Sequence, residues 1–152
     1  MDDLIVITHC KEETMHIAHE LANKLPDGLV ITLTGDLGAG KTTFVRGLAQ
    51  GLNIKEVVQS PTFNIMKIYF KGTRPLIHID AYRLADIDTD IGLDEYIGYE
   101  SGLTVIEWPE FVKKLIPNDS LELEIKNLGQ DNRQLTFKTK DCYLLENIKE
   151  CL

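Results

Sequence analysis

Residues 35–42 read Gly-Asp-Leu-Gly-Ala-Gly-Lys-Thr and match the pattern G-x-x-x-x-G-K-[ST] at every required position. Glycines let backbone N–H groups approach a phosphate chain closely, in backbone conformations that other residues rarely adopt. Lys41 then offers a positive charge to the β and γ phosphates, and Thr42 offers a hydroxyl to Mg²⁺. We call residues 35–42 the glycine loop, and its pattern predicts nucleotide binding.

The segments on either side of the glycine loop favour the same interpretation. Residues 30–33 predict a short apolar strand, and residues 43–52 predict a helix. A helix that begins near Lys41 directs the positive end of its dipole at a bound anion. An accidental glycine-rich turn is the alternative, and the flanking elements argue against it.

Two carboxylates stand at the ends of apolar segments that predict strands. Residues 76–80 end at Asp80, and residues 103–107 end at Glu107. In open α/β sheets, ligands bind beyond the carboxyl ends of the strands, so both acids are candidates for holding a metal ion or water. The alternative for Asp80 is a carboxylate that caps the next turn. The alternative for Trp108, which follows Glu107, is a half-buried core aromatic.

Residues 60–62, Ser-Pro-Thr, precede another predicted strand at residues 63–70. A hydroxyl there could reach the γ-phosphate or its metal, as in segments that nucleotides order and release. A simple turn is the alternative. His16 and His19 share one side of a predicted helix, but the sequence indicates no third ligand, so we do not expect a metal site there.

The bulk properties fit one domain over residues 1–152. The 152 residues are 43% apolar, and no apolar stretch is long enough to cross a bilayer. The acidic start lacks the basic region of a signal peptide, and the three cysteines form no C-x-x-C pair, so we expect a cytoplasmic protein with reduced thiols. The net charge of −8 argues against direct binding of nucleic acid, because such binding depends largely on Lys and Arg that neutralise phosphates. Any RNA would be held by a partner.

Helical and strand patterns alternate early in the chain, and strands pair with each other later. The expected strands are residues 4–8, 30–33, 63–70, 76–80, 103–107, 121–126 and 133–138, and the expected helices are residues 15–25, 43–52, 109–115 and 143–152. This order predicts a single-domain α/β fold of the P-loop NTPase type, in which helices flank a mixed sheet.

Four motifs together carry a family resemblance. They are residues 35–42, residues 60–63 (Ser-Pro-Thr-Phe), residues 78–84 (His-Ile-Asp-Ala-Tyr-Arg-Leu) and residues 105–110 (Val-Ile-Glu-Trp-Pro-Glu). In this order and at these separations they closely resemble the TsaE family, the bacterial P-loop ATPases of tRNA threonylcarbamoyladenosine biosynthesis. The resemblance covers nearly the whole chain.

The resemblance implies a cytoplasmic protein that binds ATP or ADP with Mg²⁺ and acts with TsaB and TsaD to form N6-threonylcarbamoyladenosine in tRNA. It implies an ATPase whose low intrinsic activity the partners stimulate. The transfer of the threonylcarbamoyl group belongs to TsaD, so this chain would not be the transferase. It would reach tRNA through the complex and bind neither DNA nor a membrane.

The resemblance also assigns roles to residues of this chain. Lys41 matches the phosphate lysine, Thr42 and Glu107 the magnesium ligands, and Asp80 the acid important for hydrolysis. The expected nucleotide contacts are Gly35, Asp36, Leu37, Gly38, Ala39, Gly40, Lys41, Thr42, Thr43 and Arg133. The expected switch or partner-sensing residues are Ser60, Pro61, Thr62 and Trp108. Residues 10–14 and the hairpin around Arg133 match parts that enclose the adenine.

Three other functions stay open at the level of the residues. A small GTPase is disfavoured, because no Asp-x-x-Gly follows Asp80 and no Asn-Lys-x-Asp segment is present. A small-molecule kinase is disfavoured because phosphoryl transfer usually needs cations near the migrating charge, and the chain has four arginines and no arginine-rich lid. A passive nucleotide binder without turnover is the third alternative.

Overall fold

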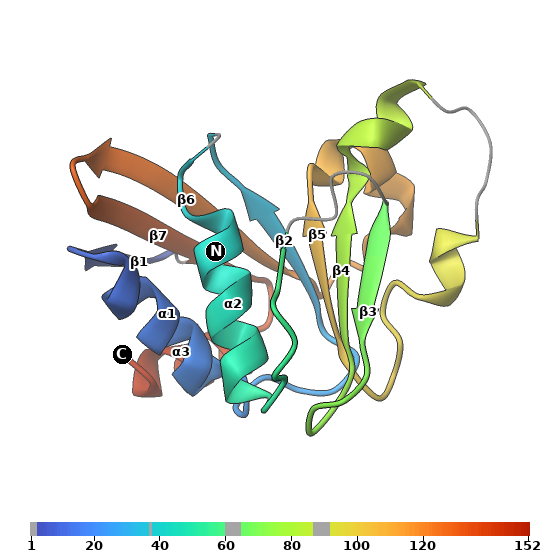
Figure 1. Ribbon diagram of the computed structural model, residues 1–152, viewed down its shortest axis with the longest axis horizontal. Coiled ribbons are helices and arrows are strands. Elements are labelled where there is room, and N and C mark those ends of the chain that lie inside the picture. Colours follow the sequence, from blue (N-terminus) through green and yellow to red (C-terminus); the bar gives the residue numbers. More distant parts are fainter. Residues whose placement is uncertain (1–2, 37, 60–64, 87–91) are drawn as a thin grey trace.

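The computed structural model describes residues 3–36, 38–59, 65–86 and 92–152. The described strands form one seven-stranded sheet in the order β1-β7-β6-β2-β5-β4-β3 (Figure 1). Their bounds are β1 (Leu4–Thr8), β2 (Val30–Thr34), β3 (Met66–Tyr69), β4 (Leu76–Asp80), β5 (Leu103–Glu107), β6 (Leu121–Gly129) and β7 (Asn132–Lys138). β2 runs parallel to β5 and β6, and β4 runs parallel to β5, whereas β1, β3 and β7 are antiparallel to their neighbours. The expected mixed sheet is confirmed.

Helices cover the two faces of the sheet differently. The α-helices are α1 (Lys11–Leu21), α2 (Lys41–Gly51) and α3 (Cys142–Glu150), and the short 3-10 helices are η1 (Ala81–Asp86), η2 (Leu93–Glu95) and η3 (Pro109–Leu115). Side chains of all three α-helices pack with β2, β5, β6 and β7 in the larger core cluster, which places these helices on one face (Figure 1). A smaller cluster on the other face joins β4 and β5 to Leu93 of η2 and Val112 of η3.

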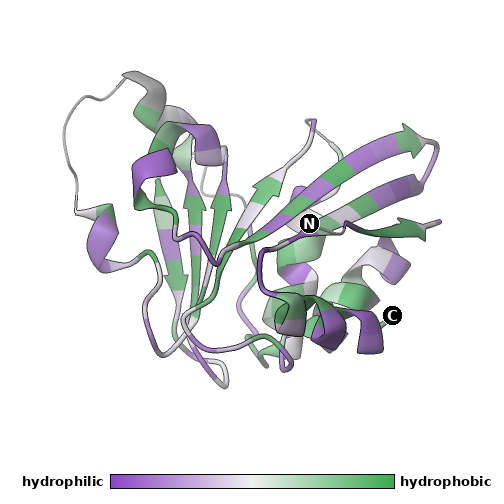
Figure 2. Cartoon of the chain, turned by 180° about the vertical axis from the view of Figure 1, so that it is seen from behind, coloured by the Kyte–Doolittle hydropathy of each residue, from purple (hydrophilic) through white to green (hydrophobic). Residues whose placement is uncertain are grey.

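The strands beside the glycine loop are buried differently on its two sides. β4 and β5 are buried at every position, because both faces of this part of the sheet are covered. β6 alternates instead, with Leu121, Leu123 and Ile125 buried and the residues between them exposed. Figure 2 shows this alternation as green and purple bands along β6 and β7. One face of the β6–β7 hairpin therefore meets solvent.

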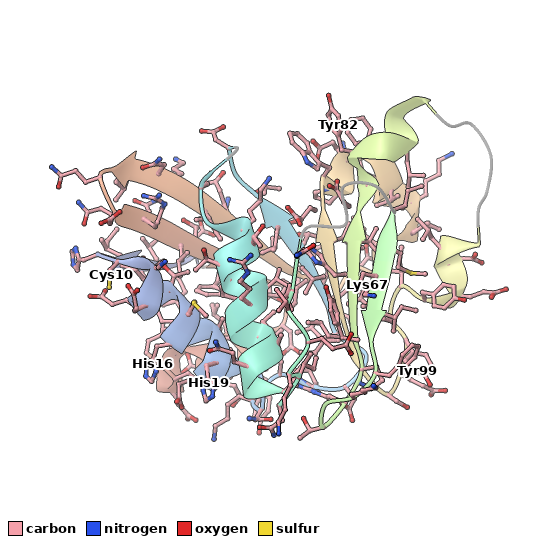
Figure 3. All side chains as sticks on the ribbon, in the orientation of Figure 1. Cys10, His16, His19, Lys67, Tyr82 and Tyr99 are labelled. Atoms are coloured by element: carbon pink, nitrogen blue, oxygen red, sulfur yellow. The ribbon has the colours of Figure 1, made fainter. Side chains whose placement is uncertain are left out.

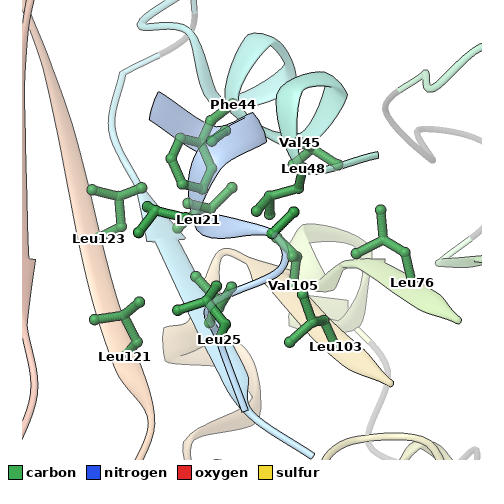
Figure 4. Packing of buried hydrophobic residues seen from close by; sticks show 14 of the residues in the cluster. Leu21, Leu25, Phe44, Val45, Leu48, Leu76, Leu103, Val105, Leu121 and Leu123 are labelled. Atoms are coloured by element: carbon green, nitrogen blue, oxygen red, sulfur yellow. The ribbon is translucent and has the colours of Figure 1, made fainter. Parts of the chain in front are cut away.

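Helix α2 is fixed against the sheet by the apolar side chains Phe44, Val45 and Leu48, all buried (Figure 4). Burying side chains of this size contributes about 1.5–3 kcal/mol each. Gly47 lets α1 approach closely, because a Cβ atom at this position would lie 2.5 Å from the carbonyl oxygen of Met15. The start of α2, and with it the glycine loop, is held in place by this packing.

Some elements differ from the sequence predictions at their ends. α2 begins at Lys41, two residues before the predicted start, and β6 continues to Gly129. The predicted helix at residues 109–115 is a 3-10 helix interrupted at Val112, where φ is −134°. The predicted strand at residues 63–70 is described from residue 65 onward, and β3 spans Met66–Tyr69. Within the described ranges, no helix is both long and apolar enough to span a lipid bilayer.

Candidate functional site

The glycine loop connects the carboxyl end of β2 to the start of α2. At Gly35 the backbone passes so close to β6 that an added Cβ atom would lie 2.5 Å from the carbonyl oxygen of Ile125. Gly40 is the N-cap of α2 with a φ of 108°, a conformation that strongly favours glycine. The glycines therefore serve the close approach and the tight turn that the motif requires.

The first turn of α2 faces the loop with unpaired backbone N–H groups, as every helix start does. Lys41, Thr42 and Thr43 occupy this turn, and the turn contains no acidic residue. A positive dipole end whose own turn carries no carboxylate suits an anion. Among the other predicted contacts, Ala39 is buried and Asp36 exposed, whereas Leu37 lies outside the described residues.

The two predicted acids meet at the edge of the sheet where the glycine loop begins. Asp80 of β4 pairs in register with Glu107 of β5, and Glu107 pairs with Leu33 of β2. Both acids are buried, with Asp80 9% and Glu107 4% exposed. One Asp80 oxygen accepts a hydrogen bond from the backbone N–H of Tyr82 at 3.1 Å. Asp80 therefore makes the turn-capping contact of the alternative interpretation, and this contact still leaves acceptor capacity on the carboxylate for the expected role.

Glu107 is the centre of a buried polar cluster. Its Oε1 atom lies 3.9 Å from Nζ of Lys41, and its Oε2 atom lies 2.6 Å from Nε2 of His78. The side chains of all three residues are at most 10% exposed. Charges so far from water interact more strongly than surface charges do. The fold therefore joins the loop lysine to the acid of a strand 66 positions away in the sequence.

Trp108 stands at the rim of this cluster in a left-handed conformation, with φ of 58° and ψ of 55°. Bulky side chains rarely adopt positive φ, and such strain concentrates at functional sites. Lys41 Nζ lies 4.9 Å from the centre of its ring, and the Tyr82 ring lies 5.0 Å away. Trp108 is 36% exposed and contacts the site lysine, so it is an exposed ring at the site and not the half-buried core aromatic of the alternative interpretation.

Arg133 of β7 contacts the opposite side of the glycine loop. Its Nε donates to the carbonyl oxygen of Ala39 at 3.0 Å, and Nη2 donates to that of Gly38 at 3.5 Å. Nη1 donates to the side-chain oxygen of Asn127 at 3.0 Å. The guanidinium thus braces the backbone of the loop.

Two cavities of about 430 Å³ each flank the glycine loop. One is lined by Cys10, Lys11, Glu12, Thr14, Gly38, Gly40, Thr43, Asp131 and Arg133. The other is lined by Leu33, Thr34, Gly35, Asp36, Lys41, Trp108, Glu110, Glu124, Ile125 and Lys126. Figure 3 shows Cys10 at the start of α1 on one side of the loop and Tyr82 beyond the end of β4 on the other. The first cavity joins residues 10–14 to Arg133, the two regions expected to enclose a base.

The predicted switch residues Ser60, Pro61 and Thr62 lie outside the described residues. The predictions also missed His78, although its position two residues before Asp80 puts both side chains on one face of a strand. His16 and His19 take part in no group of three or more His, Cys, Asp or Glu able to hold a metal ion, within the described part of the chain. The three cysteines are free.

Comparisons with known proteins show the family to which this chain belongs. Residues 8–135 match the sequence profile of a family described as threonylcarbamoyl adenosine biosynthesis protein TsaE. The chain is 47% identical over 126 residues to the tRNA threonylcarbamoyladenosine biosynthesis protein TsaE of Bacillus subtilis, covering 83% of this chain and 79% of that one. It is 38% identical to the protein of the same name from Treponema pallidum, covering 86% and 96%.

A solved structure extends the similarity to the fold. The crystal structure of YdiB from Bacillus subtilis superposes with a TM-score of 0.83 at 37% identity, covering 99% of this chain and 94% of that one. The similarity thus includes the glycine loop and the strands that end in Asp80 and Glu107. By sequence profile, by identity and by fold, this chain belongs to the TsaE family.

Proposed function

We propose that this chain is the Mg²⁺-dependent, ATP-binding and ATP-hydrolysing component of bacterial tRNA N6-threonylcarbamoyladenosine biosynthesis, and that it works in the cytoplasm with TsaB and TsaD. The relatives it matches carry that pathway in their names. One observation carries the chemical part of the proposal. The glycine loop, Lys41 and the paired acids Asp80 and Glu107 converge at one edge of the sheet.

In this proposal Lys41 binds the β and γ phosphates, which offer it a stronger anionic partner than Glu107 alone. The Thr42 hydroxyl and the Glu107 carboxylate hold Mg²⁺, because this hard cation prefers oxygen ligands. The metal would neutralise charge on the β and γ phosphates. Asp80 orients the attacking water, since it is paired with Glu107 across the strands and keeps free acceptor capacity.

The nucleotide base would enter the cavity between the start of α1 and Arg133, with the phosphates on the loop. Thr43 lines that cavity directly after the loop. We propose adenine as the base, on the strength of the family resemblance.

The partners TsaB and TsaD are proposed to complete the catalytic site. Tyr82, Trp108 and Phe111 form a cluster of exposed aromatic rings beside the acids, with 6.0 Å between the ring centres of Tyr82 and Phe111. Aromatic side chains are enriched at protein interfaces. Closure by partners would raise a low intrinsic turnover. The net charge of −8 favours tRNA contact through the partners, and TsaD performs the transfer.

The test measures nucleotide affinity by calorimetry and phosphate release by a continuous assay, for the chain alone and mixed with TsaB and TsaD. We expect ATP and ADP to bind in preference to GTP, turnover to require Mg²⁺, and turnover to rise in the mixture. Equal binding of GTP would favour the GTPase alternative. Binding without turnover in any mixture would favour the passive binder, and equal turnover with and without partners would contradict activation.

A further inference from the structure

His78 is a fully buried ring on a face of the sheet where its neighbours in strand and register include aliphatic side chains. Strand alternation places it on the same face of β4 as Leu76 and Asp80, and its partner in register on β5 is Val105. Leu76 and Val105 both belong to the larger core cluster. A polar ring in such surroundings costs stability unless it forms a hydrogen bond, so its partner matters.

That partner is Glu107, whose Oε2 atom lies 2.6 Å from Nε2 of His78. An ionised carboxylate carries no proton, so Nε2 donates. Nδ1 is buried and has no hydrogen-bond partner among the described residues. The tautomer with its proton on Nε2 leaves only a lone pair without a partner, which is less costly than an orphaned N–H. The polar contact of His78 is therefore directed at Glu107.

The hydrogen bond fixes which oxygen of Glu107 faces the glycine loop. Oε2 is held by His78 inside the core, and Oε1 points to Nζ of Lys41 at 3.9 Å. Without the bond, the carboxylate could rotate about its last torsion, which has broad preferences. Groups that hydrogen-bond to a metal ligand without contacting the metal commonly set the orientation of that ligand and the affinity for the metal.

We propose that His78 is a positioning residue that orients Glu107 toward the magnesium and phosphate site. The proposal rests on the proposed function, in which Glu107 holds Mg²⁺. A histidine that merely fills the core would affect stability alone. A positioning histidine affects Mg²⁺ affinity through its donor atom.

The experiment compares His78→Leu, His78→Gln and His78→Asn. Leu fills the space without a donor, Gln carries an amide nitrogen close to the place of Nε2, and Asn is one methylene too short to reach Glu107. Calorimetry gives the affinity of the ADP-bound protein for Mg²⁺ and the affinity for ADP without metal, and thermal unfolding reports stability. Leu76→Val, on the same face of the same strand, is the matched core control.

We expect the Leu and Asn variants to weaken Mg²⁺ binding by about tenfold or more, with metal-free ADP affinity unchanged. The Gln variant should recover most of the Mg²⁺ affinity, and Leu76→Val should lower stability without weakening Mg²⁺ binding. If the Leu variant does not fold, the Gln and Asn pair still decides the matter. The turnover of each folded variant should follow its Mg²⁺ affinity.

The inference is overturned if the Leu and Asn variants bind Mg²⁺ like the parent, if Gln is as weak as Asn, or if Leu76→Val weakens Mg²⁺ binding as much as His78→Leu. In each case the parent itself binds Mg²⁺ with the nucleotide, so the proposed function survives. A parent whose ADP complex does not bind Mg²⁺ would instead contradict the proposed function, and this inference with it.

Discussion

The two sides of the glycine loop are built from different kinds of contact. On the acid side, Lys41 meets the carboxylate of Glu107 and the ring of Trp108, so side chains face side chains. On the hairpin side, Arg133 donates to the loop carbonyls of Ala39 and Gly38. One side presents groups that can change partners when a ligand arrives. The other side holds the backbone that such a ligand would contact.

Burial explains why the two sides differ. The acid side lies on β4 and β5, which are buried along their length, so its charges are desolvated and interact strongly. The hairpin side lies on β6 and β7, where one face meets solvent, and charged contacts there are screened. Substitutions on the acid side should therefore lower the rate of hydrolysis. Substitutions on the hairpin side should loosen the glycine loop and weaken nucleotide binding.

The largest effect is expected from Lys41→Ala, because it removes the charge that opposes the phosphates. Turnover should fall by at least about a hundredfold, because this is the usual loss when a donor that stabilises charge in the transition state is removed. Thermal unfolding should show an intact fold. Phosphate release and calorimetry with ATP check this. If the variant bound and hydrolysed ATP like the parent, the glycine loop would not be the phosphate-binding site.

Glu107→Gln tests the acid side next, since it removes a charge with little change in shape. Mg²⁺-dependent turnover should fall by about tenfold to a hundredfold, as for other losses at a metal site. ADP binding measured without Mg²⁺ should change much less. If metal-free ADP affinity fell by as much as Mg²⁺-dependent turnover, Glu107 would lie outside the magnesium site.

Asp80→Asn should have a smaller effect, and on turnover rather than on binding. The amide still orients a water molecule but is a poorer base, so we expect turnover to fall by about tenfold, less than the loss of a full general base. ATP affinity should stay close to that of the parent. A loss of Mg²⁺ affinity larger than that of Glu107→Gln would show that the two acids exchange roles.

Arg133→Ala should have the smallest effect on chemistry, because the hairpin side braces the loop. Hydrogen bonds from charged groups contribute about 1.5–3 kcal/mol when buried, and this guanidinium is partly exposed, so nucleotide affinity should fall by about tenfold at most. The loss should be the same with and without Mg²⁺. Arg133→Lys is the control, since it keeps the charge but lacks the planar fork. A loss of turnover without a loss of nucleotide affinity would instead show that Arg133 takes part in hydrolysis.

The local patterns of the sequence determined the elements of the site. The glycine loop with its strand and helix, and the acids at the ends of β4 and β5, were all predictable because strand alternation, glycine spacing and helix starts depend on neighbouring residues. The boundaries were less secure: α2 begins at Lys41 itself, and the segment at residues 109–115 forms a 3-10 helix interrupted at Val112.

The tertiary structure alone decided how these elements meet. Sheet order places β5 between β2 and β4, so Glu107 lies beside the loop and Asp80 one strand further away. It also brings Arg133 to Ala39, 94 residues earlier, and His78 to Glu107. Pairing between distant strands depends on packing of the whole sheet. The periodicity of residues along the chain does not predict which strands become neighbours. The sequence by itself therefore determined which groups could do the chemistry, and the fold decided which of them act on one another.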